Sequence, residues 1–344
     1  MAMKIKYCDD TDKLKWNNYV KSHPQGNFYQ LFDWKEIINN SFGHKAYYLS
    51  VYVDGSIVGI FPLIYINSLI FGKILSSMPF VNYGGMLFDS DEVKELLIKE
   101  AEKLAQSLNV KYIEIRSNNL IDIDLPATAH KVSLNIKLDN DHQQLWDGFT
   151  SKHRNNIRRV YKKGVSVQSG SADLLETFYN VLSASWKGLG TPFYRIDYFR
   201  DIIEQFDDSI KIFVASVGGE PIATAFNGYF NNTVEGMWAG TLVQARKLQP
   251  NYVLYWEMMK DACDTGNKIY NLGRSTVGSS AEDFKKKWNS TPTQLHWYYY
   301  LNKIDEIPQL NVNNPKYHLA IEAWRKSPKF FTDFIGPLIA KNIP

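Results

Sequence analysis

The stretch from Ser275 to Pro292, STVGSSAEDFKKKWNSTP, places three consecutive lysines between a Ser/Gly-rich loop and an aromatic run. A lysine ammonium aimed at a carbonyl oxygen can stabilise the negative charge that develops there during acyl transfer. The same residues also fit the end of an amphipathic helix, on which Phe284 and Trp288 pack at i and i+4 while the lysines face water. Both interpretations stay open on this stretch alone.

Most familiar catalytic signatures are absent from the sequence. It contains no GxSxG, HExxH, GxxxxGK[ST] or GxGxxG motif. The seven histidines are scattered without metal-ligand spacing, so no metal site is expected. The chemistry that remains is phosphate binding and oxyanion stabilisation by Arg, Lys and aromatic residues in loops and at strand ends.

The sharpest helical periodicity covers Leu145 to Gly164, LWDGFTSKHRNNIRRVYKKG. Thr150 or Ser151 is expected to cap the start of this helix, and Gly164 suits the left-handed position after its end. Because no Asp or Glu lies between Ser151 and Gly164, the polar side predicts a phosphate-binding stripe, with an ordinary solvated surface as the alternative. His153 falls on the apolar side and is expected to pack there. The basic residues are Lys152, Arg154, Arg158, Arg159, Lys162 and Lys163.

Two distant parts of the chain share one order of elements: a β-hairpin, an amphipathic helix and a strand that ends in Arg-Ser. This order indicates one fold duplicated within the chain, although such short patterns also recur by chance. Two helices, at 11–22 and 33–42, are expected before the first hairpin, and helices at about 141–163 and 171–186 before the second. The repeated elements are 46–66, 90–110 and 111–117, then 211–230, 249–267 and 268–275.

These elements predict an α/β (α+β) fold with mixed sheets flanked by helices. The length of 344 residues suggests two domains, expected at 1–145 and 146–305. A helical tail at 306–344 is expected to pack back on the chain. Residues 56–75 approach the length of a membrane span but are interrupted by Pro62, Asn67 and Lys73, so two strands and a turn are expected instead.

The cysteine content and the start of the sequence bear on location. Only Cys8 and Cys263 occur, outside any CxxC spacing, which favours a reducing environment. The first residues, MAMKIKYCDD, lack the apolar segment of a secretory signal. A cytoplasmic protein is therefore expected.

Several motifs together resemble the FemABX-like family, which comprises peptidoglycan-bridge aminoacyltransferases and related proteins of polysaccharide gene clusters. The resemblance is strongest over about 145–301. It implies two tandem domains of the GNAT acyltransferase type and transfer of an aminoacyl or acyl group to an amine. The chain lacks the long helical arm of the larger members. The motifs are SKHRNNIRRVYKKGV, GLGTPFYRIDYF, MWAGTLVQARKLQPNYVLYWEMM and YNLGRSTVGSSAEDFKKKWNSTP, with NFYQLFDWKEI, VGIFPL and PFVNYGGM in the first half.

The resemblance also implies roles for individual residues. Phe284 and Lys285 match a Phe-Lys pair in the transfer site of the short members, where the lysine helps to stabilise the charge of the tetrahedral intermediate. Other positions match regions that contact the acceptor or its phosphates, although a structural role stays open for each and core packing is the stronger expectation for Trp34. These acceptor-binding candidates are Gln30, Trp34, Lys35, Tyr194, Arg195, Arg274 and Ser275.

The donor is less well defined. GNAT enzymes that use acetyl-CoA usually carry a [QR]xxGx[GA] loop whose amides hold the pyrophosphate. The corresponding stretch here, QARKLQPNY from Gln244 to Tyr252, has no glycine, although Arg246 and Lys247 could hold another phosphate. Loss of this loop favours an aminoacyl-tRNA donor over acyl-CoA, and no tightly bound cofactor is expected.

Three functions stay open at this point. The first is an aminoacyltransferase with tRNA on the basic helix and a nucleotide-sugar or lipid-linked envelope precursor as acceptor, with peripheral membrane contact. The second is N-acylation by a CoA thioester during exopolysaccharide or envelope assembly. The third is a non-catalytic RNA- or polysaccharide-binding protein on a GNAT scaffold, because one fold hosts many functions.

Overall fold

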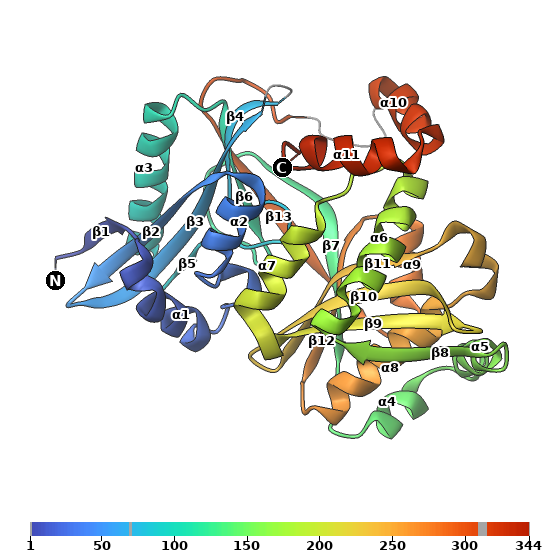
Figure 1. Cartoon of the computed structure of the whole chain (residues 1–344). Helices are drawn as coiled ribbons and strands as arrows, with labels where there is room; N and C mark the ends of the chain where they lie inside the picture. Colours follow the sequence, from blue (N-terminus) through green and yellow to red (C-terminus); the bar gives the residue numbers. More distant parts are fainter. Residues whose placement is uncertain (1, 69–70, 309–314, 344) are drawn as a thin grey trace. The chain divides into compact units, whose positions relative to one another are not determined.

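The computed structural model describes residues 2–68, 71–308 and 315–343 of the chain. It forms two compact units, coloured along the sequence in Figure 1. Unit 1 comprises residues 1–132, 294–309 and 341–344, and unit 2 comprises residues 133–293 and 310–340. Both units combine helices with a mixed sheet, which confirms the expected fold class.

Unit 1 contains a sheet, and a hydrophobic core lies between this sheet and helix α3 (Asp91–Ser107). Ser90 caps α3 by accepting from the amide of Val93, and the apolar face of the helix packs on the strands. The strand order is β1 (Lys4–Tyr7), β2 (Lys45–Val53), β3 (Ser56–Ser68), β4 (Gly72–Ser76), β6 (Tyr112–Ser117) and β13 (Thr291–Leu301), with β5 (Leu87–Phe88) beside β3. The other helices are η1 (Asp10–Asp12), α1 (Lys13–Ser22), η2 (Phe28–Gln30) and α2 (Trp34–Phe42).

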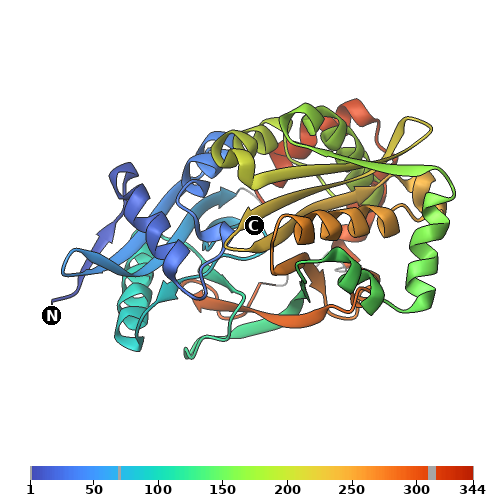
Figure 2. The same ribbon diagram turned by 90° about the horizontal axis from the view of Figure 1, so that it is seen from below.

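Unit 2 carries helices on both faces of its sheet. Helix α6 (Leu175–Leu189) packs on the central strands and α8 (Asn251–Asp264) packs on the opposite face (Figure 2). The strand order is β7 (Ala127–Lys137), which enters from unit 1, then β12 (Ile269–Thr276), β11 (Thr233–Thr241), β10 (Glu220–Phe230), β9 (Ile210–Val217) and β8 (Val165–Gly170). The remaining helices are α4 (His142–Gly148), α5 (Ser151–Tyr161), η3 (Ala172–Leu174), α7 (Ile196–Phe206), η4 (Asp207–Ser209), η5 (Val243–Leu248), α9 (Ser280–Lys286), α10 (Pro315–Lys326) and α11 (Lys329–Ala340).

The two units share one strand connectivity. In unit 1 β2 and β3 are antiparallel, β3 and β4 are antiparallel, and β4 and β6 are parallel across the α3 crossover. In unit 2 β9, β10, β11 and β12 repeat this pattern across the α8 crossover. The structure thus confirms the repeated hairpin, helix and strand. The domain boundaries at 1–145, 146–305 and 306–344 stay a prediction. The two compact units describe how the chain packs and do not test where a duplicated domain begins or ends.

The long periodic segment 145–164 is two helices and not one. Phe149 has extended backbone angles, φ −76° and ψ 149°, which end α4. Thr150 then caps α5, since its hydroxyl accepts from the amide of His153, as expected. Gly164 has a φ of 79°, in the left-handed region.

Residues 56–75 form strands β3 and β4, as expected, while the positions 69–70 of the predicted turn lie outside the described residues. Among the helices of residues 2–68, 71–308 and 315–343, none has the length and apolar character needed to cross a bilayer.

Candidate active site

The side chain of Lys285 is buried in unit 2, where 8% of the residue is exposed. Helix α9 presents it, and Ser279 caps that helix by accepting from the amide of Glu282. The Nζ atom donates to the carbonyl oxygens of Gly273 and Arg274 at 2.8 and 3.1 Å. Lys285 is therefore tied to strand β12 and is not a solvated side chain.

Two neighbouring carbonyls of strand β12 can bind one amine because the backbone of this strand bends at Gly273. It pairs with β11 from Ile269 to Asn271, and this pairing does not extend to the two carbonyls that Lys285 binds. Gly273 has a φ of 78°, a conformation that favours glycine. The Asn271 side chain holds this bend by accepting from the Gly273 amide at 2.8 Å. Consecutive carbonyls of a regular strand point to opposite sides, so the bend explains their convergence.

Burial, together with a smaller effect of the nearby Arg274 charge, lowers the pKa of the Lys285 amine to about 7. The amine is thus close to half protonated near neutral pH. Its protonated form can donate to an oxyanion, and its neutral form can accept a proton.

The three lysines of the opening stretch have different environments. Lys286 is exposed and pairs with Glu282 at 2.7 Å, and Lys287 is exposed. Phe284 packs on Trp288, as the amphipathic interpretation predicts, and also on Tyr252 and Tyr255, with ring centroids 5.4–6.2 Å apart. The solvated interpretation therefore fits Lys286 and Lys287 and fails for Lys285.

The Oγ of Ser275 and the Nε2 of His153 are among the buried polar atoms of unit 2 that have no hydrogen-bond partner among the described residues. His153 packs on Trp288 with centroids 4.3 Å apart, and burial lowers its pKa to about 4. It is therefore a neutral packing residue, as expected. The described part of the chain holds no group of His, Cys, Asp and Glu side chains that could bind a metal ion.

The two acceptor candidates before α7 differ in exposure. The Tyr194 ring packs among Trp186, Phe193 and Tyr198. Arg195 is exposed and pairs with Asp197 at 3.1 Å. The structure gives Tyr194 a packing role and leaves Arg195 accessible.

The three candidates in unit 1 all have partners within that unit. The Gln30 amide donates to the carbonyl of Gly85 and accepts from the Asn27 amide, and the Trp34 indole donates to the carbonyl of Phe28. Both side chains are buried, which indicates structural roles for them. Lys35 pairs with Asp10 at 2.9 Å and is half-buried.

Helix α5 presents its basic residues unequally. The Nη1 atom of Arg154 donates to the carbonyls of Trp146, Asp147 and Phe149 at 2.8–3.4 Å, so it caps the end of α4. Arg154 is therefore a structural residue and not a free member of the stripe. Lys152, Arg158, Arg159, Lys162 and Lys163 are exposed.

The loop before α8 lies beside this stripe. Arg159 donates to the Gln249 side chain at 2.7 Å, which joins α5 to the segment that carries the exposed Arg246 and Lys247. These two residues, the exposed Lys152, Arg158 and Arg159 of α5, and Lys162 and Lys163 just after its end form what we call the basic surface of unit 2.

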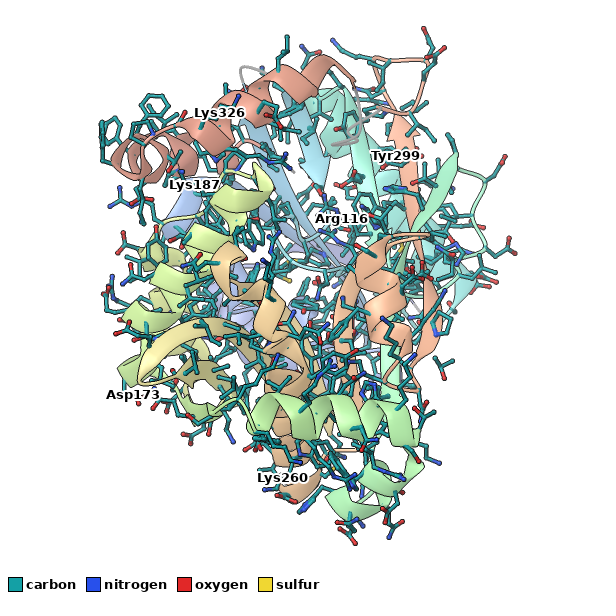
Figure 3. The ribbon with its side chains drawn as sticks, turned by 90° about the vertical axis from the view of Figure 1, so that its right-hand side faces the viewer. Arg116, Asp173, Lys187, Lys260, Tyr299 and Lys326 are labelled. Atoms are coloured by element: carbon teal, nitrogen blue, oxygen red, sulfur yellow. The ribbon has the colours of Figure 1, made fainter. Side chains whose placement is uncertain are left out.

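Sequence reasoning missed a buried ion pair in unit 1. The Arg116 Nε donates to Glu114 at 2.7 Å, Tyr299 donates to the other carboxylate oxygen, and the guanidinium stacks on Trp297. Figure 3 labels Arg116 and Tyr299. Glu114 and Arg116 are two positions apart in β6, so their side chains lie on the same face of the strand. That spacing within the otherwise apolar YIEIRS was the available signal.

Sequence comparison finds known proteins that are similar to parts of this chain. Residues 151–286 match the model of the acetyltransferase (GNAT) domain. The chain is 30% identical over 164 residues to the UDP-N-acetylmuramoylpentapeptide-lysine N(6)-alanyltransferase of Weissella viridescens, covering 46% of this chain and 48% of that protein. It is 22% identical over 233 residues to the lipid II:glycine glycyltransferase of Staphylococcus haemolyticus, covering 59% and 54%. The chain thus spans about half the length of these curated relatives.

Solved structures show the same fold over most of the chain. The crystal structure of FemX has a TM-score of 0.66 at 16% identity and covers 92% of this chain and 100% of that one. A tandem GNAT protein from the clavulanic acid biosynthesis pathway has a TM-score of 0.55 at 10% identity and covers 88% and 100%.

The sheet connectivity and the match over α5 to α9 define a GNAT-domain protein. More narrowly, the chain is related to the FemABX aminoacyltransferases, which confirms the resemblance of its motifs.

Proposed function

We propose that this protein is an aminoacyltransferase of the FemABX type. It transfers an aminoacyl group from aminoacyl-tRNA to an amine on a cell-envelope or polysaccharide precursor, either a nucleotide sugar or a lipid-linked molecule. The observation that carries the proposal is the buried amine of Lys285. This residue belongs to α9, its amine binds a carbonyl of strand β12, and both lie within the residues that match the GNAT domain model. These donors are made in the cytoplasm, so the proposal places the reaction there.

The chemistry needs no covalent intermediate on the protein. The acceptor amine attacks the ester carbonyl carbon of the donor, a C–N bond forms, and the bond to the ribose oxygen breaks. The proton lost by the amine ends on the released ribose hydroxyl. Protonated Lys285 donates to the oxyanion that forms between these events, while two of its N–H groups remain on Gly273 and Arg274.

The start of α8 supports a donor other than CoA. The amides of Tyr252, Val253 and Leu254 donate to the carbonyls of Gln249 and Pro250, so they are engaged within the helix start. A pyrophosphate cradle requires such amides to be free. The basic surface of unit 2, in contrast, offers seven exposed cations to a polyphosphate backbone.

A CoA-dependent N-acyltransferase of exopolysaccharide assembly is the second candidate, and the match to an acetyltransferase domain favours it. A donor screen separates the two. Full-length protein is mixed with labelled aminoacyl-tRNA or labelled acyl-CoA and with amine-bearing envelope precursors, and transfer of the label is followed. Transfer from charged tRNA alone is expected, and transfer from acyl-CoA alone would contradict the proposal.

Filter binding of tRNA tests the basic surface separately. Because each neutralised phosphate releases condensed counterions, affinity is expected to fall steeply with salt. The variant Lys152→Glu/Arg158→Glu/Lys162→Glu should weaken binding and flatten this salt dependence, without lowering thermal stability. Replacing Lys4, Lys13 and Lys45 of unit 1 by Glu provides a charge-matched control that should bind normally.

A further inference from the structure

Helix α11 packs on unit 2 through its small residues and exposes its large apolar ones. Thr332, Gly336 and Ala340 are buried. Phe330, Phe334 and Leu338 are 78%, 74% and 51% exposed. At ~100° per residue the two sets lie about 200° apart around the helix axis. This arrangement is the reverse of an ordinary surface helix, whose large apolar residues face the core.

The buried side of α11 is closely fitted. A Cβ on Gly336 would meet the backbone of Phe193 and the ring of Trp324 at 3.4 Å. Trp324 of α10 also contacts Phe331. Helix α10 is held in turn by Arg325, which donates to the carbonyl of Leu189. The orientation of α11 is therefore fixed by packing.

The exposed side is continuous and free of charge. Phe330, Phe331, Phe334, Pro337 and Leu338 fall within an arc of about 120° at this helical spacing, and no charged residue of α11 shares it. Exposed aromatic patches of this kind mark interaction sites.

The charge around α11 identifies the kind of partner. Residues 315–344 hold five Lys and Arg against two Asp and Glu, a formal charge of +3 that equals the net charge of the whole chain. Lys329 pairs with Asp333 and Arg325 pairs with Glu322, whereas Lys326 is exposed and has no ion pair among the described residues (Figure 3). The apolar arc is thus set in a positively charged segment.

We propose that α11 docks this protein on an anionic lipid surface, with Phe330, Phe334 and Leu338 inserted at the level of the acyl chains and the basic side chains at the headgroups. An amphipathic helix with aromatic residues on one face and cations beside it binds in this way. Its 12 residues span about 18 Å, well short of the ~30 Å hydrocarbon core, so it lies in the interface. This inference does not depend on the proposed transfer reaction.

Flotation of full-length protein with lipid vesicles tests the proposal. Vesicles of phosphatidylcholine and phosphatidylglycerol in equal parts should bind the protein, and vesicles of phosphatidylcholine alone should bind it more weakly. Phe330→Ser/Phe334→Ser should lower the partition coefficient by ~10²-fold, since two apolar side chains are removed from the interface. Both side chains are already in water, so the fold should persist.

The control is Leu14→Ser/Leu120→Ser, which removes two equally exposed apolar side chains from unit 1 and should bind like the wild type. Lys326→Gln should weaken binding to the anionic vesicles only. Failure of the wild type to float with anionic vesicles would overturn the proposal, as would equal binding by the Phe330→Ser/Phe334→Ser variant. A dimer that this variant abolishes, without vesicle binding by the wild type, would assign the face to a second copy of the chain instead.

Discussion

The Nζ atom of Lys285 lies 2.8 Å from the carbonyl oxygen of Gly273, a residue whose φ of 78° favours glycine. The position of the candidate catalytic amine therefore depends on one backbone bend in β12. Sequence alone shows the lysine but not the bend that holds it.

Gly273→Ala should disturb this bend. A left-handed conformation costs an L-residue about 1–2 kcal/mol, so urea unfolding should show a loss of that size and transfer should slow. Gly218→Ala is the matched control, because Gly218 also has a positive φ, of 58°, with open space around its Cβ position. It should lose similar stability and keep its activity. Equal activity of the two variants would show that the reaction does not depend on the bend at Gly273.

Lys285→Ala should fold and lose about 10² to 10³ in the single-turnover rate, the usual effect of removing one oxyanion donor. Lys287→Ala, whose side chain is exposed, should keep its rate. Because the pKa of Lys285 is about 7 and the donor must be protonated, the wild-type rate should gain a descending limb as pH rises through about 7. An ascending limb there would instead assign Lys285 as the general base.

The same pKa predicts a stability effect that needs no substrate. The folded-state pKa, about 7, lies below the ordinary value of 10.5, so between these values the unfolded chain binds more protons and stability rises with pH. The difference in unfolding free energy between wild type and Lys285→Met should therefore shift in favour of wild type by about 1.4 kcal/mol per pH unit. Chemical denaturation at several pH values from about 7.5 to 9.5 measures it, and a constant difference would refute the buried state of the amine.

Arg154→Ala should destabilise the protein, because it removes hydrogen bonds to two α4 carbonyls and to the carbonyl of Phe149, which follows that helix. Hydrogen bonds to a charged group contribute about 1.5–3 kcal/mol, which sets the expected loss in unfolding free energy. Lys152→Ala, on the exposed side of the same helix, should change stability by less than about 0.5 kcal/mol. Equal stability of the two variants would show that Arg154 does not stabilise the end of α4 and that it is available, like its neighbours, to bind phosphate.

Arg116→Leu should cost about 3–5 kcal/mol, because it leaves the buried Glu114 carboxylate without its cation. Glu114→Leu/Arg116→Leu should recover much of that loss, since no unpaired charge remains. A double-mutant cycle by urea unfolding measures the coupling. Additive losses would show that the two side chains do not stabilise each other.

Local patterns predicted the parts of the fold that local physics determines. The two hairpins, the helix pair α3 and α8 and the Thr150 cap all follow from periodicity and capping within a few residues. The later part of β13 was recognised only as an aromatic run, because its partner β6 lies about 180–190 residues earlier and no local signal joins them.

The candidate site was less accessible to sequence reasoning. Lys285, Lys286 and Lys287 are chemically identical, and only the rotation of the short helix α9 against β12 buries the first of them. Arg154 and Arg158 likewise differ by the break at Phe149, which turns a carbonyl toward Arg154. In both cases tertiary packing determines which of several identical side chains is buried or hydrogen-bonded, and the local sequence does not contain that information.

The order in which the chain visits its two units has a consequence for its synthesis on the ribosome. Strand β6 gains its antiparallel partner only when residues 296–301 have been made, after the whole of residues 133–293. N-terminal domains usually fold first as they emerge, but here the sheet of unit 1 stays one strand short until unit 2 is nearly complete. A nascent chain that stalls or terminates before residue 296 therefore carries an unpaired edge in the unit that was translated first.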